Sequence, residues 1–241
     1  VLRPGGHMSG QHGRTRQMAS LEARGEFLVY LVADAVPAGR SWLHKLVEAV
    51  AQDPQAAGAY SRQLPRHGAS ALEAHRLIHR GSSADRREVR DIKNRPEFWS
   101  LPPLERLRFC EFDDVSACRR ASLLGPFPIP PVDWAEDLVW ARQVLLSGFR
   151  IVYEPASQVR HSHADTIFHA FRRGYLDQLV AGTNFGVVYF SGPLTLIRGF
   201  IALWIEQARA IWKGERGLFR RLYLFGWNVP RLAAELKGNY A

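Results

Sequence analysis

The chain has 241 residues, of which 46% are hydrophobic and 23% are charged, and this composition excludes a wholly disordered protein. The length suffices for one large domain or for a domain with an appendage. A net charge of +9 and a pI near 10.1 indicate an anionic partner: nucleic acid, acidic lipid or a phosphorylated substrate. The two cysteines, Cys110 and Cys118, form neither a zinc-type cluster nor a disulfide framework, which fits a reducing compartment.

The first sixty residues alternate between helix and strand patterns. A helix is expected over residues 14–24, and the apolar run at 26–32 predicts a strand that is covered on both faces. Residues 56–63 predict another short strand. This order predicts an α/β fold with a mainly parallel sheet flanked by helices, in which functional groups gather beyond the carboxyl ends of the strands.

A turn and a helix lie between these two strands. Asp34 stands in the turn that follows the first strand, where it is either a functional carboxylate at a strand end or an ordinary turn aspartate. Ser41 can cap the helix that follows. The expected apolar face of this helix consists of Trp42, Leu43, Leu46, Val47 and Val50.

The middle of the chain is polar and rich in arginine and proline. Residues 64–108 are expected to form a flexible excursion with one helix around 71–80, and their basic run is also typical of a solvated face. Residues 109–124 predict a short strand, followed by a basic turn at Arg119 and Arg120 that opens a helix.

An acidic segment then begins a helix that ends at Gly148. Asp133 is a candidate N-cap, and Glu136 stands three residues later, at the capping-box spacing. Asp137 is not explained by capping. It either favours the positive end of the helix or acts as a general base at the mouth of a cleft. The predicted core face of this helix consists of Trp134, Leu138, Ala141 and Leu145.

A strand and a histidine pair follow this helix. Residues 149–153 predict a strand that ends in a turn at Glu154-Pro155. His161 and His163 close the segment, and on a strand their side chains would point the same way. Histidines at this spacing either bind a metal or serve the structure.

The last segment, residues 165–241, reads as helices that mix large apolar residues with arginines. It holds ten Lys/Arg and five Asp/Glu, a net charge of +5. The uncharged stretch 178–197 has the length of a membrane span, but it contains Asn184 and Pro193 and is not predicted to be one. Such helices suit either a membrane surface or a helical cap on the preceding domain.

Four motifs, in order, resemble a family 2 glycosyltransferase of the GT-A fold, and most of all its bacterial rhamnosyltransferase-like branch. They are HGRTRQMASLEARGEFLVYLVADAVPAGRSWL, GAYSRQLPR, FDDVSACRRASL and AEDLVWARQVLLSGFRIVYEPASQVRHSH. The resemblance covers about residues 12–175. Together with the change in composition at residue 165, it leads us to expect two domains: a partial GT-A domain over residues 1–164 and a basic helical extension over 165–241.

The resemblance implies roles for several acids and histidines. Asp34 takes the place of the last carboxylate of an Asp-x-Asp motif, which binds a divalent Mg or Mn ion on the donor diphosphate, and Val32 replaces the first acid. Glu136 and Asp137 match the Glu-Asp pair, whose aspartate deprotonates the acceptor hydroxyl in inverting transfer. His161 or His163 would be a further metal ligand.

The resemblance also implies contacts with the donor. Arg119 and Arg120 match a basic turn that faces the acceptor or the phosphates, and Arg14 and Arg16 match a segment that approaches the nucleotide. The strand and turn that hold the nucleotide base in the family have no counterpart before His12. The expectation is therefore a chain that lacks the N-terminal nucleotide-binding segment.

Two hypotheses follow. In the first, the chain is an inverting glycosyltransferase that moves a sugar, with L-rhamnose the candidate, from a nucleotide-diphosphate donor to a glycan or lipid-linked acceptor. Its location would be cytoplasmic, with peripheral contact on the inner face of the membrane through the C-terminal helices, and no nucleic acid as partner. In the second, it is a non-catalytic basic module that binds a membrane or nucleic acid, and Asp34 and Asp137 then lie on unrelated surfaces.

Overall fold

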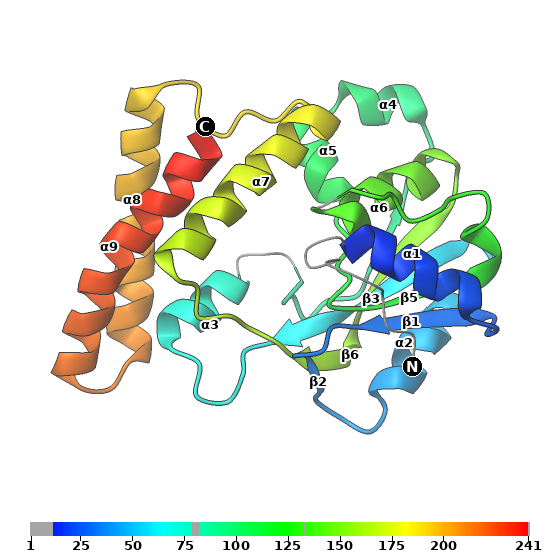
Figure 1. The fold of residues 1–241 in the computed structure, drawn as a ribbon, viewed down its shortest axis with the longest axis horizontal. Coiled ribbons are helices and arrows are strands. Elements are labelled where there is room, and N and C mark those ends of the chain that lie inside the picture. The colour runs from blue at the N-terminus through cyan, green and yellow to red at the C-terminus, as the bar shows by residue number, and fades with distance from the viewer. Residues whose placement is uncertain (1–11, 79–81, 133, 241) are drawn as a thin grey trace. The chain divides into compact units, whose positions relative to one another are not determined.

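The computed structural model describes residues 12–78, 82–132 and 134–240 (Figure 1). The chain divides into two compact units. The first consists of Val1–Gln63 and Ser82–His161, and the second of Leu64–Gly81 and Ser162–Ala241. The second unit therefore combines a segment from the middle of the chain with the C-terminal residues.

The first unit is built on a sheet with the strand order β1-β5-β3-β6-β2, in which β4 also pairs with β6. The strands are β1 (Phe27–Leu31), β2 (Val36–Pro37), β3 (Ala56–Leu64), β4 (Glu88–Asp91), β5 (Ser116–Arg120) and β6 (Arg150–Arg160). The predicted strands at 26–32 and 56–63 are thus confirmed. The α/β fold class is confirmed as well, because helices flank this sheet (Figure 1).

The prediction of a mainly parallel sheet is wrong. β5 lies antiparallel between β1 and β3, which consequently run in the same direction as each other. β2 and β4 both pair with β6 in antiparallel register. A helix–strand alternation predicts parallel neighbours, but it cannot show that a strand from later in the chain is inserted between them.

β6 is longer than predicted and runs through Glu154-Pro155, which is therefore not a turn. Proline cannot donate a ladder hydrogen bond, yet the strand tolerates it here. β4 pairs with residues 150–153 of β6, and β2 pairs with residues 159–160. Pro155 falls between these two partners, where neither of them needs its missing N–H group.

The helices of the first unit are α1 (His12–Glu22), α2 (Trp42–Ala51), α4 (Arg95–Ser100), α5 (Pro103–Phe109) and α6 (Glu136–Leu146), with a 3₁₀ turn η1 (Ala121–Leu123). Leu46 and Val50 of α2 are fully buried in a core cluster that includes Cys118 and Val152. Leu43, predicted on the same face, is 47% exposed. Ser41 precedes α2 but makes no side-chain cap hydrogen bond.

The end of α6 agrees with the prediction and its buried face agrees only in part. Gly148 has a φ of +87°, the left-handed conformation that glycine adopts at little cost. Trp140, Ala141, Val144 and Leu145 are fully buried, whereas the predicted Trp134 and Leu138 are half-buried. Trp134 precedes the helix, which begins at Glu136, and the buried face is the one that carries Trp140 and Val144.

The stretch 64–108 contains more regular structure than the flexible excursion predicted from its composition. Besides the expected helix, here α3 (Ala71–Ile78), it includes β4, α4 and most of α5. Residues 79–80, the end of the predicted helix, lie outside the described residues. Phe98 of α4 is buried and stacks edge-on against Trp99 and Phe109, so aromatic packing orders a segment that is otherwise polar.

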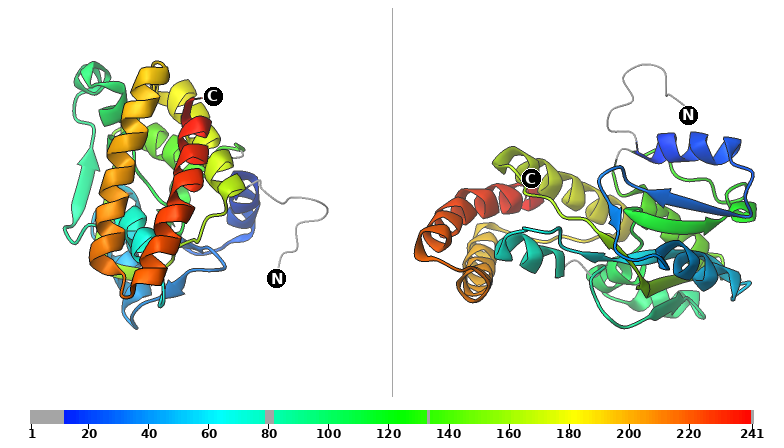
Figure 2. Two further views of the ribbon diagram at one scale, coloured as in Figure 1. Left: turned by 90° about the vertical axis from the view of Figure 1, so that its left-hand side faces the viewer. Right: turned by 90° about the horizontal axis from the view of Figure 1, so that it is seen from below.

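The second unit is helical and consists of α3, α7 (Ile167–Phe185), α8 (Pro193–Gly214) and α9 (Leu218–Tyr240). Within it, α9 packs on α7 and α8 (Figure 2), and Ile211 and Leu224 form a small core with Leu72 of α3. Over the described ranges, none of the helices is both long and apolar enough to cross a membrane.

Candidate active site and metal centre

The carboxylates of Glu136 and Asp137 stand on the first turn of α6, next to a strained residue. Ala135 precedes the helix with φ 53° and ψ 37°, a left-handed conformation that costs an L-residue other than glycine about 1–2 kcal/mol. Glu136 is the first helical residue and not the third, so the predicted capping box is not formed. Asp133, the predicted N-cap, lies outside the described residues.

Asp137 is held in place by backbone groups. Its carboxylate accepts hydrogen bonds from the N–H of Leu138 (2.9 Å) and from the N–H of Asp114 (3.2 Å). Burial raises the pKa of Asp137 well above its ordinary value, and the carboxylates of Asp114, Glu136 and Asp113 raise it further. A carboxyl whose pKa is shifted in this direction is a better proton acceptor at neutral pH than an ordinary aspartate.

Glu136 and Asp114 share a cation from the first helix. Arg16 of α1 forms an ion pair with the buried Glu136, and its Nε lies 3.6 Å from the carboxylate of Asp114. Burial raises the pKa of Glu136, while the positive charge of Arg16 opposes that rise. Arg16 therefore tethers α1 to the start of α6.

A glycine lets α1 approach this closely. A Cβ atom on Gly13 would lie 2.1 Å from the carbonyl oxygen of Pro130 and 3.1 Å from Cβ of Glu136. Any larger residue would push the helix away. Arg14, one residue further on, is exposed on α1, and its predicted contact with a nucleotide stays a prediction.

The prediction that Arg119 and Arg120 form a basic turn is wrong, because both residues lie in β5. Arg119 is fully buried, pairs with Asp114 at 2.9 Å and stacks over the ring of Trp140. Arg120 donates to the carbonyl oxygens of Val50 (2.8 Å) and Asp53 (3.1 Å) at the end of α2. The predicted contact of Arg119 and Arg120 with the donor or acceptor stays a prediction. In this structure both guanidinium groups bond to groups within the first unit.

Asp34 stands in the turn between β1 and β2, and strand pairing brings it to the end of β6. Val36 of β2 is in register with Arg160 of β6, which brings the turn that holds Asp34 close to the residues after Arg160. The first of these residues is His161, whose Nε2 lies 3.6 Å from a carboxylate oxygen of Asp34. His161 is 8% exposed, and Asp34 is about half-exposed.

His163 completes a group of three potential metal ligands. One ligand atom from each of Asp34, His161 and His163 lies within 4.8 Å of the others. His163 follows the last residue of the first unit by two positions, so the chain itself keeps it near His161. Both histidines lie beyond the end of β6, and not on a strand as predicted. Two imidazoles and a carboxylate are a donor set that suits divalent transition metals.

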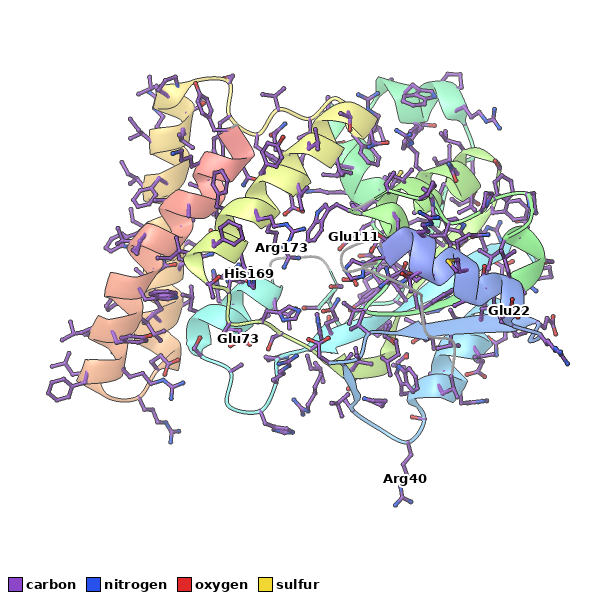
Figure 3. The ribbon with its side chains drawn as sticks, in the orientation of Figure 1. Glu22, Arg40, Glu73, Glu111, His169 and Arg173 are labelled. Atoms are coloured by element: carbon purple, nitrogen blue, oxygen red, sulfur yellow. The ribbon has the colours of Figure 1, made fainter. Side chains whose placement is uncertain are left out.

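Three polar residues of this region were not singled out from the sequence. Asp113 and Asp114 precede β5, and Gln63 lies near the end of β3, where its side chain bonds to both His161 and Asp113. Asp113 and Asp114 could have been identified from the sequence, because they are two consecutive acids shortly before a buried strand. Glu111 lies two residues before Asp113 in the same loop (Figure 3).

These contacts connect Asp34 with Asp137 inside the first unit. From Asp34 the contacts pass to His161, to Gln63 and to Asp113, and the next residue, Asp114, donates its N–H group to Asp137. The non-catalytic hypothesis expects Asp34 and Asp137 on unrelated surfaces. A continuous chain of contacts thus links the two residues inside the first unit.

No protein-family model matches the chain. The O-antigen chain rhamnosyltransferase WbaN of Salmonella anatum is 31% identical over 173 residues, which are 69% of this chain and 50% of that protein. The O-antigen chain rhamnosyltransferase RfbN of Salmonella typhimurium strain LT2 is 28% identical over 172 residues, with the same shares. The chain thus spans about half the length of the curated relatives it matches.

Among solved structures, the chain is similar to the mannosyltransferase PcManGT from Pyrobaculum calidifontis in complex with GDP-Man and Mn²⁺. That match has a TM-score of 0.49 and 15% sequence identity, and it covers 94% of this chain and 66% of that one. The two curated relatives confirm the resemblance to rhamnosyltransferase-like glycosyltransferases that the sequence motifs predict.

Proposed function

We propose that this chain, which is rhamnosyltransferase-like in sequence, acts in an inverting glycosyltransferase of cell-surface polysaccharide synthesis. The sugar, with L-rhamnose the candidate, passes from a nucleotide-diphosphate donor to a glycan or lipid-linked acceptor. The observation that carries this proposal is the site of Asp137: a carboxylate of raised pKa on the first turn of α6, preceded by a strained Ala135. The names of the two curated relatives support the sugar and the pathway class.

In this mechanism Asp137 takes the proton of the acceptor hydroxyl. Inverting transfer requires a base on the acceptor side of the anomeric carbon, opposite the leaving diphosphate. The two backbone N–H donors fix the direction of the carboxylate, and Arg16 holds Glu136 beside it. Glu136, ion-paired and buried, positions the start of α6 while Asp137 acts as the base.

The experiment for the base is Asp137→Asn. Transfer of rhamnose from a nucleotide diphosphate to an O-antigen-type acceptor should fall by about 10²–10⁴-fold, because the amide cannot accept the proton. Asp177→Asn is the matched control, since Asp177 lies on α7 in the other unit and pairs with Arg173 there. Undiminished turnover in Asp137→Asn would refute the assignment, and a product with retained anomeric configuration would refute inversion.

We further propose that Asp34, His161 and His163 hold a divalent metal. When bound, the metal would act as a Lewis acid on the donor diphosphate. With a single carboxylate among the three donors, the site should prefer Mn²⁺ over Mg²⁺, which favours oxygen ligands. Calorimetric titration should show tighter binding of Mn²⁺, and His163→Ala should weaken it. Equal binding of Mn²⁺ by His163→Ala would remove His163 from the ligand set.

The exposed apolar side chains of the second unit support contact with an anionic membrane surface. Ile197, Ile201 and Ile205 of α8 and Leu218, Phe219, Leu222 and Tyr223 of α9 are all exposed, with Phe219 at 89%. Residues 165–241 carry ten basic and five acidic side chains, a net charge of +5. Apolar side chains combined with positive charge are typical of helices that lie in a lipid headgroup layer.

Vesicle co-sedimentation tests this contact. The double variant Phe219→Ser, Leu222→Ser should lose binding to vesicles that contain acidic lipid, and raised salt should weaken binding of the unaltered chain. Leu43→Ser is the matched control, because Leu43 is 47% exposed but belongs to the first unit. Binding that is unchanged in the double variant would exclude these helices as the contact.

A further inference from the structure

Gln63 lies at the centre of the polar contacts beneath the candidate metal centre. It is 4% exposed and belongs to β3, and its backbone N–H donates to the carbonyl oxygen of Ser82 at 2.7 Å. Its side-chain amide contacts three groups: Oγ of Ser82 at 3.1 Å, a carboxylate oxygen of Asp113, and Nδ1 of His161 at 2.9 Å. Both ends of the amide are therefore engaged, in a site closed to solvent.

The neighbours of Gln63 decide which end of the amide faces the histidine. The carboxylate of Asp113 accepts from the N–H of Val115 through one oxygen (2.9 Å) and bonds to Gln63 through the other. A carboxylate only accepts hydrogen bonds, so the NH₂ group of Gln63 must point toward Asp113. The carbonyl oxygen, Oε1, then faces His161.

This orientation fixes the proton on the imidazole ring. Because Oε1 of Gln63 only accepts, Nδ1 of His161 must carry the hydrogen. The lone pair of the neutral ring is then on Nε2, the nitrogen that lies 3.6 Å from Asp34. A metal-binding histidine needs a free lone pair, and a hydrogen bond to its other nitrogen sets both the tautomer and the ring direction.

We propose that Gln63 is a positioning residue that presents Nε2 of His161 toward the metal site, and that Asp113 sets the direction of the Gln63 amide. The inference rests on the proposed metal centre and extends it to two residues that do not touch the metal.

The length and chemistry of glutamine suit this position, and related side chains do not. Glutamate would place a second carboxylate against Asp113, methionine would offer no hydrogen bond, and asparagine is one methylene shorter. Of these, only glutamine donates to Asp113 and accepts from His161 at the same time.

The first test is spectroscopic and needs no metal. Nitrogen NMR of the histidine-labelled chain, with the His161 signals assigned through His161→Asn, reports which ring nitrogen carries the hydrogen. At a pH where the ring is neutral, the unaltered chain should show His161 protonated at Nδ1. Gln63→Met should convert this single tautomer into a mixture. A ring protonated at Nε2 in the unaltered chain would overturn the inference without any variant.

The second test is calorimetric titration with Mn²⁺. Gln63→Met should raise the dissociation constant by about 10–100-fold, the usual effect of losing a partner that orients a metal ligand. The control is Gln158→Met, the same change on β6, where the side-chain amide bonds to the carbonyl oxygen of Pro155. It should alter neither the His161 tautomer nor the Mn²⁺ affinity.

The two readouts separate this inference from the proposed function. If the unaltered chain binds no Mn²⁺ but shows the Nδ1-protonated ring, and Gln63→Met disturbs it, the metal centre fails while the positioning of His161 stands. If Mn²⁺ binds equally well to the unaltered chain and to Gln63→Met, the metal centre stands and the role of Gln63 is refuted.

Discussion

Replacing Arg119 by methionine separates the role that the structure gives this residue from the one that the sequence resemblance implies. Arg119 is fully buried, and its guanidinium carbon lies 4.4 Å from the ring centroid of Trp140 and 5.0 Å from that of Phe112. It pairs at 2.9 Å with Asp114, which is 2% exposed. Methionine fills similar space between the rings but leaves Asp114 without this partner.

The expected loss follows from the environment of Asp114. Breaking a buried ion pair on one side costs about 3–5 kcal/mol, because the remaining charge stays desolvated. Nε of Arg16 lies 3.6 Å from the same carboxylate and offsets part of this cost. We therefore expect Arg119→Met to lower the free energy of unfolding by about 3 kcal/mol, the lower end of that range.

Urea unfolding followed by circular dichroism measures this change. Adding Asp114→Asn to Arg119→Met should recover part of the lost stability, since the uncompensated charge is then removed. Arg40→Met on an exposed loop (Figure 3) is the control and should change stability by less than about 0.5 kcal/mol. If Arg119→Met unfolds like the unaltered chain yet loses nucleotide affinity, Arg119 is a ligand contact and the reasoning from burial is wrong.

Three further predictions concern titration and packing. Burial raises the pKa of Glu111 to about 7, so the folded chain disfavours the ionised form of this carboxyl. The free energy of unfolding should therefore fall as the pH rises from about 4.5 to about 7. The glutamine of Glu111→Gln does not ionise, so over that pH window the free energy of unfolding of the variant should rise by up to about 3 kcal/mol relative to that of the unaltered chain. Urea unfolding at several pH values measures this, and a difference between the two chains that does not change with pH would contradict it. Gly238→Ala should lower the melting temperature, because its Cβ would lie 2.3 Å from a backbone oxygen of α7, whereas Gly226→Ala on the same helix meets nothing within 4 Å and should not. Burial raises the pKa of Cys110 and Cys118 to about 12, so both thiols should resist alkylation at pH 8 until denaturant is added, and rapid labelling of the folded chain would disprove their burial.

Local sequence patterns predicted the helices and strands in which apolar residues are continuous or recur at a regular spacing. The strand at 27–31, the strand at 56–64 and the helix at 42–51 each show a continuous or periodic apolar signal, and each is present. Gly148 was identified correctly because a helix end in the left-handed conformation favours glycine at that one position. These signals depend on neighbours within a few residues and need no knowledge of the fold.

The direction of the strands and the surroundings of single side chains could not be predicted in this way. The motif Arg119-Arg120 reads as a basic surface turn, but successive side chains of a strand point to opposite faces, and only the placement of β5 between β1 and β3 shows that Arg119 faces the core. Pro155 predicts a turn from the sequence, yet it falls in the gap between β4 and β2, which pair with β6 on either side of it, and the strand continues through it.

The sequence by itself singled out the residues that we propose carry the chemistry, which are the acids Asp34 and Asp137 and the histidines that follow β6, and it showed the motifs shared with rhamnosyltransferases. Only the tertiary structure decided how they are held. The pairing of β2 with β6 brings Asp34 to His161, and the end of β3 supplies Gln63, 98 positions away from the histidine it contacts. Such contacts leave no trace in local periodicity, because sheet register and the direction of an amide hydrogen bond are set by partners distant in the chain.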